Sequence, residues 1–491
     1  MNSRAIVASL AACGLVACTV GPDFIRPTPP PQPGYTAQPV VLPPAGRSDT
    51  RQQLAAAAAA ASPWWRQFGS PTLDATVAQA LADSPTVAQA QAVLAQAQQA
   101  VRIAAAGQYP QADLGAAASR SGGPADHGSG TTGGALYSAG PLVSYAPDVF
   151  GGTRRSIEQQ QALAQVQQAQ LDAARLALAA NVVEQAIAIA STHAQTAAVD
   201  AVLATDRDNV ELVRLAVDAG TGAPADLLAA QSQLAGDEAL LPPLRQQRAA
   251  ARDALAMLVG RSAGDWPVPE FELERLTLPT ALPVVVPSAL VRSRPDIRAA
   301  EAQLHAASAE IGIATANLYP QVSLSASWSQ QSASLGTLFA GDSGLWSVAA
   351  GLTAPLFHGG ALRAQQQAAV EGFRGQLAVY RQTVLLAFNQ VADVLQALAH
   401  DAESIAAQRN ALDAADASLR LAQESYSAGA GSFLQVLIAQ RGAQQARLGY
   451  VRAVGQRYLD TVQLFAAMGG PQAVGESATA PATAAPENAD R

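Results

Sequence analysis

The chain carries little charge, few aromatic residues and almost no cysteine. Charged residues make up 14% of its 491 residues and aromatic residues 5%, and there are two cysteines. Lysine is absent, and the arginines form no cluster interleaved with aromatic residues. With a formal net charge of −8, this composition argues against a nucleic-acid partner, which needs a basic surface. The composition indicates an alanine-rich, mainly helical protein.

Arrangements of residues that carry out chemistry are also missing from the sequence. The five histidines (127, 193, 305, 358 and 400) are scattered without the spacing of metal ligands. No glycine-rich phosphate loop and no nucleophile elbow can be recognised. We therefore expect no catalytic residues, no metal site and no cofactor. Any transport would have to draw its energy from a partner.

The sequence repeats itself after about 210 residues. Residues 84–111 align without a gap on residues 294–321, so that the Tyr-Pro-Gln at 109–111 falls on the Tyr-Pro-Gln at 319–321. Further along, Gly220 matches Gly429 and Gln231 matches Gln440. A repeat this long exceeds a solenoid unit and predicts two equivalent structural halves. Each half is expected to contain a helix, two strands, a very long helix, a turn and a last helix.

The first residues have the pattern of an export signal. Arg4 precedes an apolar core at 5–15 that is shorter than the roughly 20 residues needed to span a bilayer. The run Leu15-Val16-Ala17-Cys18 is a lipobox, which predicts a signal peptide at 1–17 and a covalent lipid on Cys18. The alternative is a plain signal followed by an incidental cysteine. Residues 18–62, with nine prolines between 22 and 44, are expected to form an extended, lipidated tether.

Two stretches predict helices longer than those of a globular core. Residues 154–217 contain no proline or glycine, and residues 361–428 contain only Gly372 and Gly375. Sixty-odd residues at ~1.5 Å rise make a rod of roughly 95 Å, which needs partners along its length. Small residues on its faces allow close helix packing. A coiled-coil spacer would show the same pattern, so the helices leave that alternative open.

Two pairs of segments predict strands with one apolar face. Residues 321–330 alternate apolar side chains with serine, and residues 345–354 alternate in the same way. A weaker pair lies at 112–120 and 136–145. Alternation over about ten residues is typical of membrane strands around a wet lumen, although a half-buried strand of a soluble protein shows it too. The export signal and the apparent lack of a transmembrane helix favour the membrane.

Four strands are too few to close a barrel, and unpaired strand edges are not tolerated in lipid. Two copies would give eight strands and a filled interior, whereas three would give twelve and an open lumen. A conduit therefore requires at least three copies. The expected fold is mainly helical with membrane β-strands. It comprises a first repeat at 63–260, a linker at 261–282, a second repeat at 283–470 and a disordered tail at 471–491.

Five distinctive motifs lie between residues 18 and 470: Cys18-Thr-Val-Gly-Pro-Asp-Phe, Trp64-Trp65 with Phe68, Arg294-Pro295-Asp296-Ile297 with Ala300-Glu301, Tyr319-Pro320, and Tyr426 with Gly429 followed by Ala439-Gln440-Arg441. Through these motifs, residues 18–470 resemble the outer-membrane efflux proteins (TolC-like), and specifically the lipoprotein branch that serves RND-type tripartite multidrug pumps. The resemblance implies a homotrimer in the bacterial outer membrane, with a 12-stranded β-barrel on a 12-helix periplasmic tunnel and a belt built from the N- and C-terminal portions. Compounds delivered by an inner-membrane pump and a periplasmic adaptor would leave through it.

The resemblance also implies two functional regions near the turns that follow the long helices. Adaptor contact falls on the turns themselves, at Gly220, Thr221, Gly222, Gly429, Ala430, Gly431 and Ser432. A closed periplasmic gate falls just beyond them, at Asp226, Leu434, Gln435, Ile438 and Arg441. Many family members have an aspartate where this chain has Ile438, so a ring of isoleucines would seal by apolar contact. Packing of Ile438 between helices is the alternative, and Asp226 and Arg441 are candidate ion-pair partners.

Two other functions remain open at this point. A structural or adaptor lipoprotein without a pore would also have long helices, but an adaptor should carry a lipoyl-like β module between the helix arms. The exit duct of a type I protein-secretion system would share the whole fold. The lipobox and the opening after Cys18 favour drug efflux.

Overall fold

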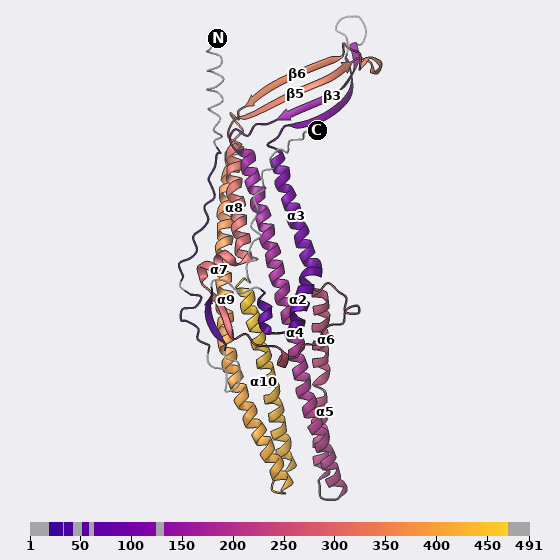
Figure 1. Cartoon of the computed structure of the whole chain (residues 1–491), viewed down its shortest axis with the longest axis vertical. Coiled ribbons are helices and arrows are strands. Elements are labelled where there is room, and N and C mark those ends of the chain that lie inside the picture. Colours follow the sequence, from indigo (N-terminus) through magenta and orange to yellow (C-terminus); the bar gives the residue numbers. More distant parts are fainter. Residues whose placement is uncertain (1–18, 33, 43–51, 58–62, 124–131, 470–491) are drawn as a thin grey trace, which may run out of the picture. The chain divides into compact units, whose positions relative to one another are not determined.

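The computed structural model describes residues 19–32, 34–42, 52–57, 63–123 and 132–469 (Figure 1). The predicted signal peptide, Cys18 and the predicted tail therefore lie outside the described residues. The chain divides into two compact units. Of the described residues, 19–27, 92–168 and 299–381 belong to the first unit, and the others belong to the second.

The sequence repeat is also a structural repeat. Helix α3 (Pro85–Ala106) and helix α8 (Pro295–Ala316) are both 22 residues long. Helix α4 (Gly152–Asp218) and helix α9 (Ala361–Ser427) are both 67 residues long. At ~1.5 Å rise per residue, each long helix extends about 100 Å. The predicted pair of very long helices is confirmed.

The two halves differ after the long helices. The second half ends in one helix, α10 (Phe433–Ala467), whereas the first half has two, α5 (Pro224–Glu238) and α6 (Leu241–Leu258). Pro242 and Pro243 stand at the start of α6. Proline lacks a backbone N–H and its ring clashes with the preceding turn, so it can begin a helix but not continue one. The single last helix expected in each half is therefore wrong for the first half.

Four strands form one antiparallel sheet in the order β2-β3-β5-β6 (Figure 1). They are β2 (Gln111–Gly123), β3 (Thr132–Tyr145), β5 (Gln321–Ser332) and β6 (Gly344–Thr353). All four predicted strands are confirmed, three of them longer than expected. Among the described residues, β2 and β6 each have a partner on one side only, so the sheet has two free edges.

The pairing places apolar residues on one face of the sheet. Trp328 lies opposite Trp346 across β5 and β6. Their neighbours in sequence point the other way, and Ser327 Oγ lies 2.9 Å from Ser347 Oγ on that face. The apolar face is not covered by the rest of the chain, since Trp346 and Val348 are both 73% exposed. Three leucines interrupt the polar face: Leu136, Leu142 and Leu345.

The second unit contains a small sheet and an aromatic cluster. Strand β1 (Gln53–Ala57) pairs in parallel with β4 (Ala281–Val285). The ring of Trp64 stacks on that of Phe465 with centroids 5.2 Å apart, and both side chains are buried. Sequence analysis assigned residues 53–57 to the tether and residues 281–282 to the linker, so it missed this sheet. The other short elements are η1 (Trp64–Phe68), α2 (Pro71–Asp83), η2 (Leu273–Arg275), α7 (Pro287–Ser293) and η3 (Leu335–Thr337).

One stretch of α4 is long and apolar enough to cross a membrane, by length and composition alone. The sequence analysis had expected no such helix. Half of that stretch is buried inside the chain, as in the core helix of a soluble protein. Packing against neighbouring helices therefore accounts for its apolar character.

We predict that Phe465→Ala destabilises the second unit by about 3–5 kcal/mol, because it leaves a cavity beside Trp64. Thermal unfolding in detergent, followed by tryptophan fluorescence, measures the change as a lower midpoint. Phe339→Ala is the matched control, since the Phe339 side chain is 79% exposed. Equal midpoints for the two variants would contradict a structural role for the aromatic cluster.

Candidate functional site

The turns that end α4 and α9 share one hydrogen-bond pattern. The backbone N–H of Thr221 donates to the carbonyl of Ala216, and the N–H of Ala430 donates to the carbonyl of Ser425, each at 2.9 Å. The glycine before each donor has a positive φ, +74° in the first turn and +72° in the second. This left-handed conformation favours glycine and ends the helix in a Schellman motif. The two glycines are Gly220 and Gly429.

The remaining turn residues are small because space is limited. A Cβ on Gly222 would lie 3.0 Å from the backbone nitrogen of Val217, and a Cβ on Gly431 would lie 3.1 Å from Cβ of Ser425. The exposed members of the two predicted tips are Gly220, Thr221, Gly429, Ala430 and Ser432. The structure thus explains the glycines by chain reversal and leaves an exposed surface at each turn.

Two of the predicted gate residues are exposed apolar side chains on α10. Leu434 is 60% exposed and Ile438 is 65% exposed. Phe433 and Val436, on another face of the same helix, are buried against α4 and α5. Within one chain, Ile438 therefore does not fill the helix interface and is free to face a lumen or another copy.

The polar gate candidates have partners within the chain. Oε1 of Gln435 accepts the backbone N–H of Ser432 at 3.3 Å, which caps the start of α10. Nη2 of Arg441 donates to Oε1 of Gln233 at 2.8 Å. Asp226 lies in the first turn of α5, where a negative charge interacts favourably with the helix dipole. Among the described residues, Asp226 and Arg441 form no ion pair with each other.

A buried polar network that sequence analysis missed lies beyond Arg441. Its members come from α4 (Asp206 and Asn209), α5 (Gln233 and Asp237) and α10 (Gln440 and Gln444). No local sequence signal marks these residues, because their partners are up to 234 positions away. The network joins three helices directly behind the predicted gate.

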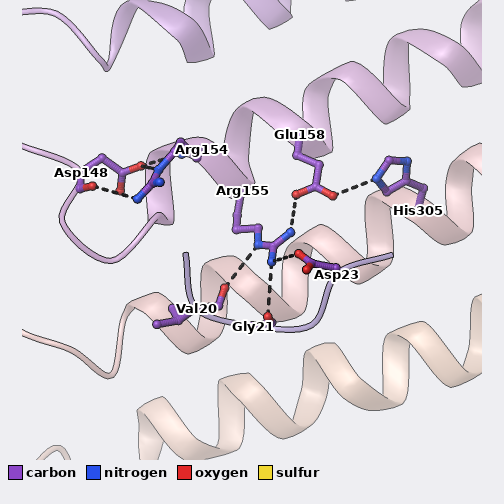
Figure 2. Close-up of polar contacts among 8 residues, drawn as sticks. All are labelled: Val20, Gly21, Asp23, Asp148, Arg154, Arg155, Glu158 and His305. Carbon is purple, nitrogen blue, oxygen red and sulfur yellow. Dashed lines mark hydrogen bonds and ion pairs between the residues drawn. The ribbon is translucent and has the colours of Figure 1, made fainter. Parts of the chain in front are cut away.

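A second polar site holds the segment that follows Cys18 (Figure 2). Arg155, in the first turns of α4, reaches this segment through three hydrogen bonds. Its guanidinium donates to Oδ1 of Asp23 at 2.7 Å and to the carbonyls of Val20 and Gly21, each at 3.3 Å. The same guanidinium donates to Oε2 of Glu158 at 2.7 Å. The Arg155 side chain is only 5% exposed, so its guanidinium is shielded from water, whereas the Asp23 side chain is 93% exposed.

The site continues from Glu158 to α8. Oε1 of Glu158 lies 2.9 Å from Nε2 of His305, a contact marked by a dashed line in Figure 2. The ring of Phe24 stacks on His305 with centroids 4.4 Å apart. Burial tends to raise the pKa of the Glu158 carboxyl. Hydrogen bonds from Arg155 and His305 outweigh burial and hold that pKa below its usual range. Glu158 is thus a carboxylate that links α4 to α8.

Close backbone contacts fix the same segment. A Cβ on Gly21 would lie 2.5 Å from Cα of Gly312 in α8, and a Cβ on Gly151 would lie 2.9 Å from Cα of Thr19. The N–H of Val20 donates to the carbonyl of Phe150 at 3.1 Å. The residues directly after Cys18 therefore pack against the turn between β3 and α4. We refer to residues 19–24 with Arg155, Glu158 and His305 as the N-terminal clamp.

A sheet with an exposed apolar face and free edges, joined to long helices, is the architecture of an outer-membrane channel. The chain belongs to the outer membrane efflux protein family, whose sequence profile matches it twice, at residues 76–261 and 286–470. Nodulation protein T of Rhizobium leguminosarum bv. viciae is 30% identical over 482 residues, which cover 96% of this chain and 94% of that protein. The pyoverdine export outer membrane protein OpmQ of Pseudomonas aeruginosa is 30% identical over 439 residues, covering 87% and 89%.

Solved channel structures share the fold. The OprN outer-membrane channel is 28% identical, with a TM-score of 0.83 over 92% of this chain and 99% of that one. The open MtrE outer membrane channel of Neisseria gonorrhoeae is 27% identical, with a TM-score of 0.78 over 92% and 98%. These relatives are channels rather than enzymes. The protein is accordingly an efflux channel of the bacterial outer membrane.

We predict that Arg155→Ala releases the segment after Cys18, because Asp23 and the carbonyls of Val20 and Gly21 lose their donor. Hydrogen bonds to charged groups contribute about 1.5–3 kcal/mol, so chymotrypsin cleavage after Phe24 should be at least about tenfold faster. Intact-mass analysis follows the cleavage. Arg374→Ala, which removes an exposed ion pair with Glu371, should leave the rate unchanged. A rate unaffected by Arg155→Ala would contradict the clamp.

Proposed function

We propose that the protein is the exit duct of a tripartite efflux pump and works as a homotrimer that passes small toxic compounds from the periplasm to the exterior. The free edges of the four-stranded sheet carry this proposal. Adjacent strands alternate in direction from β2 to β6, so β6 of one copy can pair with β2 of the next without breaking the alternation. Such a head-to-tail interface closes into a ring. Three copies supply twelve strands, enough for an open lumen.

The exposed turns support contact with a periplasmic adaptor. Each turn is closed by three backbone hydrogen bonds to the end of its long helix, and the five exposed residues are small or polar. The pump that supplies energy would be an inner-membrane transporter of the RND type. Relatives are named for export of pyoverdine and for efflux of toluene, which favours small molecules over a secreted protein as cargo.

The N-terminal clamp supports lipidation of Cys18. Thr19 is held beside Gly151, in the turn between membrane strand β3 and helix α4. A lipid on the preceding residue would therefore enter the leaflet into which the base of the barrel is inserted. Anchor and barrel would then act on the same membrane surface.

Substitutions at two adjacent positions of β6 test whether the sheet forms a membrane barrel. Val348→Arg places a charge on the apolar face, which costs about 2–4 kcal/mol near the middle of a bilayer, so we predict loss of trimer from the outer membrane. Ala349→Arg is the matched control, because the next residue of the strand faces the lumen. It should assemble and change ion selectivity in planar bilayers. Equal assembly of the two variants, measured as particle mass in detergent, would contradict the barrel.

Transport is tested in a strain that lacks the gene. We expect greater susceptibility to toxic small molecules, with rescue by the wild-type protein and by Ala349→Arg but not by Val348→Arg. Unchanged susceptibility together with a missing secreted protein would favour type I secretion instead. A non-conducting monomer would favour a structural lipoprotein.

Ile438→Asp tests the gate. If Ile438 lines the constriction, the substitution replaces an apolar ring by an acidic one. We then predict a larger single-channel conductance and a new block by divalent cations. Leu421→Asp places the same charge on an exposed position of α9 and should change neither property. Wild-type conductance and no cation block in Ile438→Asp would contradict a lining role.

A further inference from the structure

The buried network behind the gate contains two carboxyl groups without a cation. Asp206 on α4 is 2% exposed and Asp237 on α5 is 5% exposed. Both contact side chains of α10, so the pair lies where three helices of the second unit meet. Two buried charges of the same sign are unfavourable unless something compensates them.

Both carboxyl oxygens of Asp237 accept hydrogen bonds. Its Oδ2 accepts Nε2 of Gln233 at 2.8 Å, and its Oδ1 accepts Nε2 of Gln444 at 2.7 Å. The orientation of the Gln233 amide is fixed, because its oxygen accepts from Arg441 and a guanidinium can only donate. Both oxygens of Asp237 therefore face amide donors, as a carboxylate requires.

Asp206 differs from Asp237 at one oxygen. Its Oδ1 accepts Nε2 of Gln440, whose own oxygen is held by Nδ2 of Asn209 at 2.8 Å. Its Oδ2 is buried and has no hydrogen-bond partner among the described residues. Burial and then the neighbouring carboxyl of Asp237 raise the pKa of Asp206 to about 7, against the opposing effects of Gln440 and Arg207. A proton on Oδ2 would satisfy that oxygen and join the two acids.

Four arginines on these helices have other partners. On α4, Arg207 pairs with Glu238 of α5. On α10, Arg441 bonds to Gln233, Arg447 to Asp416 and Arg452 to Gln195. Among the described residues, the donors that reach the two carboxyls are neutral side-chain amides. A proton is therefore the simplest compensation for the second negative charge.

We propose that a proton held by Asp206 and donated to Asp237 locks α4, α5 and α10 together behind the periplasmic gate. Loss of this proton leaves two carboxylates in contact, and their repulsion separates the helices. The lock itself depends only on the described chain, whereas its consequence, a duct that opens more readily as the pH rises, rests on the proposed function.

The direction of the pH effect follows from where the proton is bound. The packed state holds it up to about pH 7, whereas a loosened, hydrated pair would release it near pH 4, the ordinary value for aspartate. As the pH rises between these values, the equilibrium constant for loosening increases by up to about tenfold per pH unit in each copy, because loosening releases one proton. Above pH 7 the effect levels off.

Hydrogen exchange of the intact detergent-solubilised protein at pH 5, 6, 7 and 8 tests the lock. Asp206→Asn supplies an amide that can donate to Asp237 at every pH, so it should stay locked. The exchange rate of α5 peptides in the wild type, divided by that in Asp206→Asn at the same pH, cancels the intrinsic pH dependence of exchange. We expect this ratio to rise by up to about tenfold per unit up to pH 7 and then to level off.

Two more variants test the role of Asp237 and the specificity of the pH effect. In Asp237→Asn, the new side-chain NH2 group faces the NH2 group of Gln233 or Gln444, and two donors cannot bond to each other. The α5 peptides of this variant should therefore exchange fast at every pH. Asp401→Asn is the matched control: Asp401 is half-buried with its Oδ2 shielded, its pKa is raised to about 7 by burial and by Asp460, and it lies on α9. This control should leave the pH dependence of α5 unchanged.

A ratio of α5 exchange rates between wild type and Asp206→Asn that does not change with pH would overturn the lock. Identical α5 exchange rates in Asp206→Asn and Asp237→Asn would overturn it too. Loss of the pH dependence in Asp401→Asn would show that the effect is not local and would overturn it too. None of these measurements requires a pore, so failure of the lock is distinguishable from failure of the proposed function.

Discussion

The structure depends on one constraint, which is that strand edges cannot remain unpaired in a bilayer. Each chain offers four strands, and β2 and β6 leave rows of backbone N–H and C=O groups without partners in the described chain. Water satisfies such groups at a soluble surface, but lipid does not. The apolar face of the same sheet, with the paired residues Trp328 and Trp346, has no cover within the chain. In the proposed trimer, neighbouring copies pair the edges and the bilayer covers the face.

The repeat preserves geometry more strictly than chemistry. Helices α4 and α9 have equal length and end in the same hydrogen-bonded turn. At equivalent positions on the two sides of these turns, Arg207 pairs with Glu238 in the first half, whereas Asp416 pairs with Arg447 in the second, with the charges reversed. Backbone length and turn type must match for two halves to build one tunnel wall. Exposed ion pairs contribute little to stability, so the acidic and basic members can exchange places between the two halves.

Features set by neighbouring residues could be predicted from the sequence, and features set by distant ones could not. The long helices, the alternating strands and the turns at Gly220 and Gly429 are local. The break at Pro242-Pro243 is local as well, and the prediction missed it by treating the two halves as equivalent. Strands β1 and β4 are too short to show a period and pair across more than 220 residues. The partners of Arg155 and of Asp206 likewise come together only in the fold.

The residues at the predicted gate differ from those of an acidic ring. The resemblance implies that many relatives carry an aspartate facing the pore, where it would bind cations. In this chain the exposed position is Ile438, and the nearby acids, Asp206 and Asp237, are buried behind it among amide side chains. A buried acid pair is inaccessible to hydrated cations but can exchange a proton. The same helices would then respond to pH through their packing and not to cations through the pore.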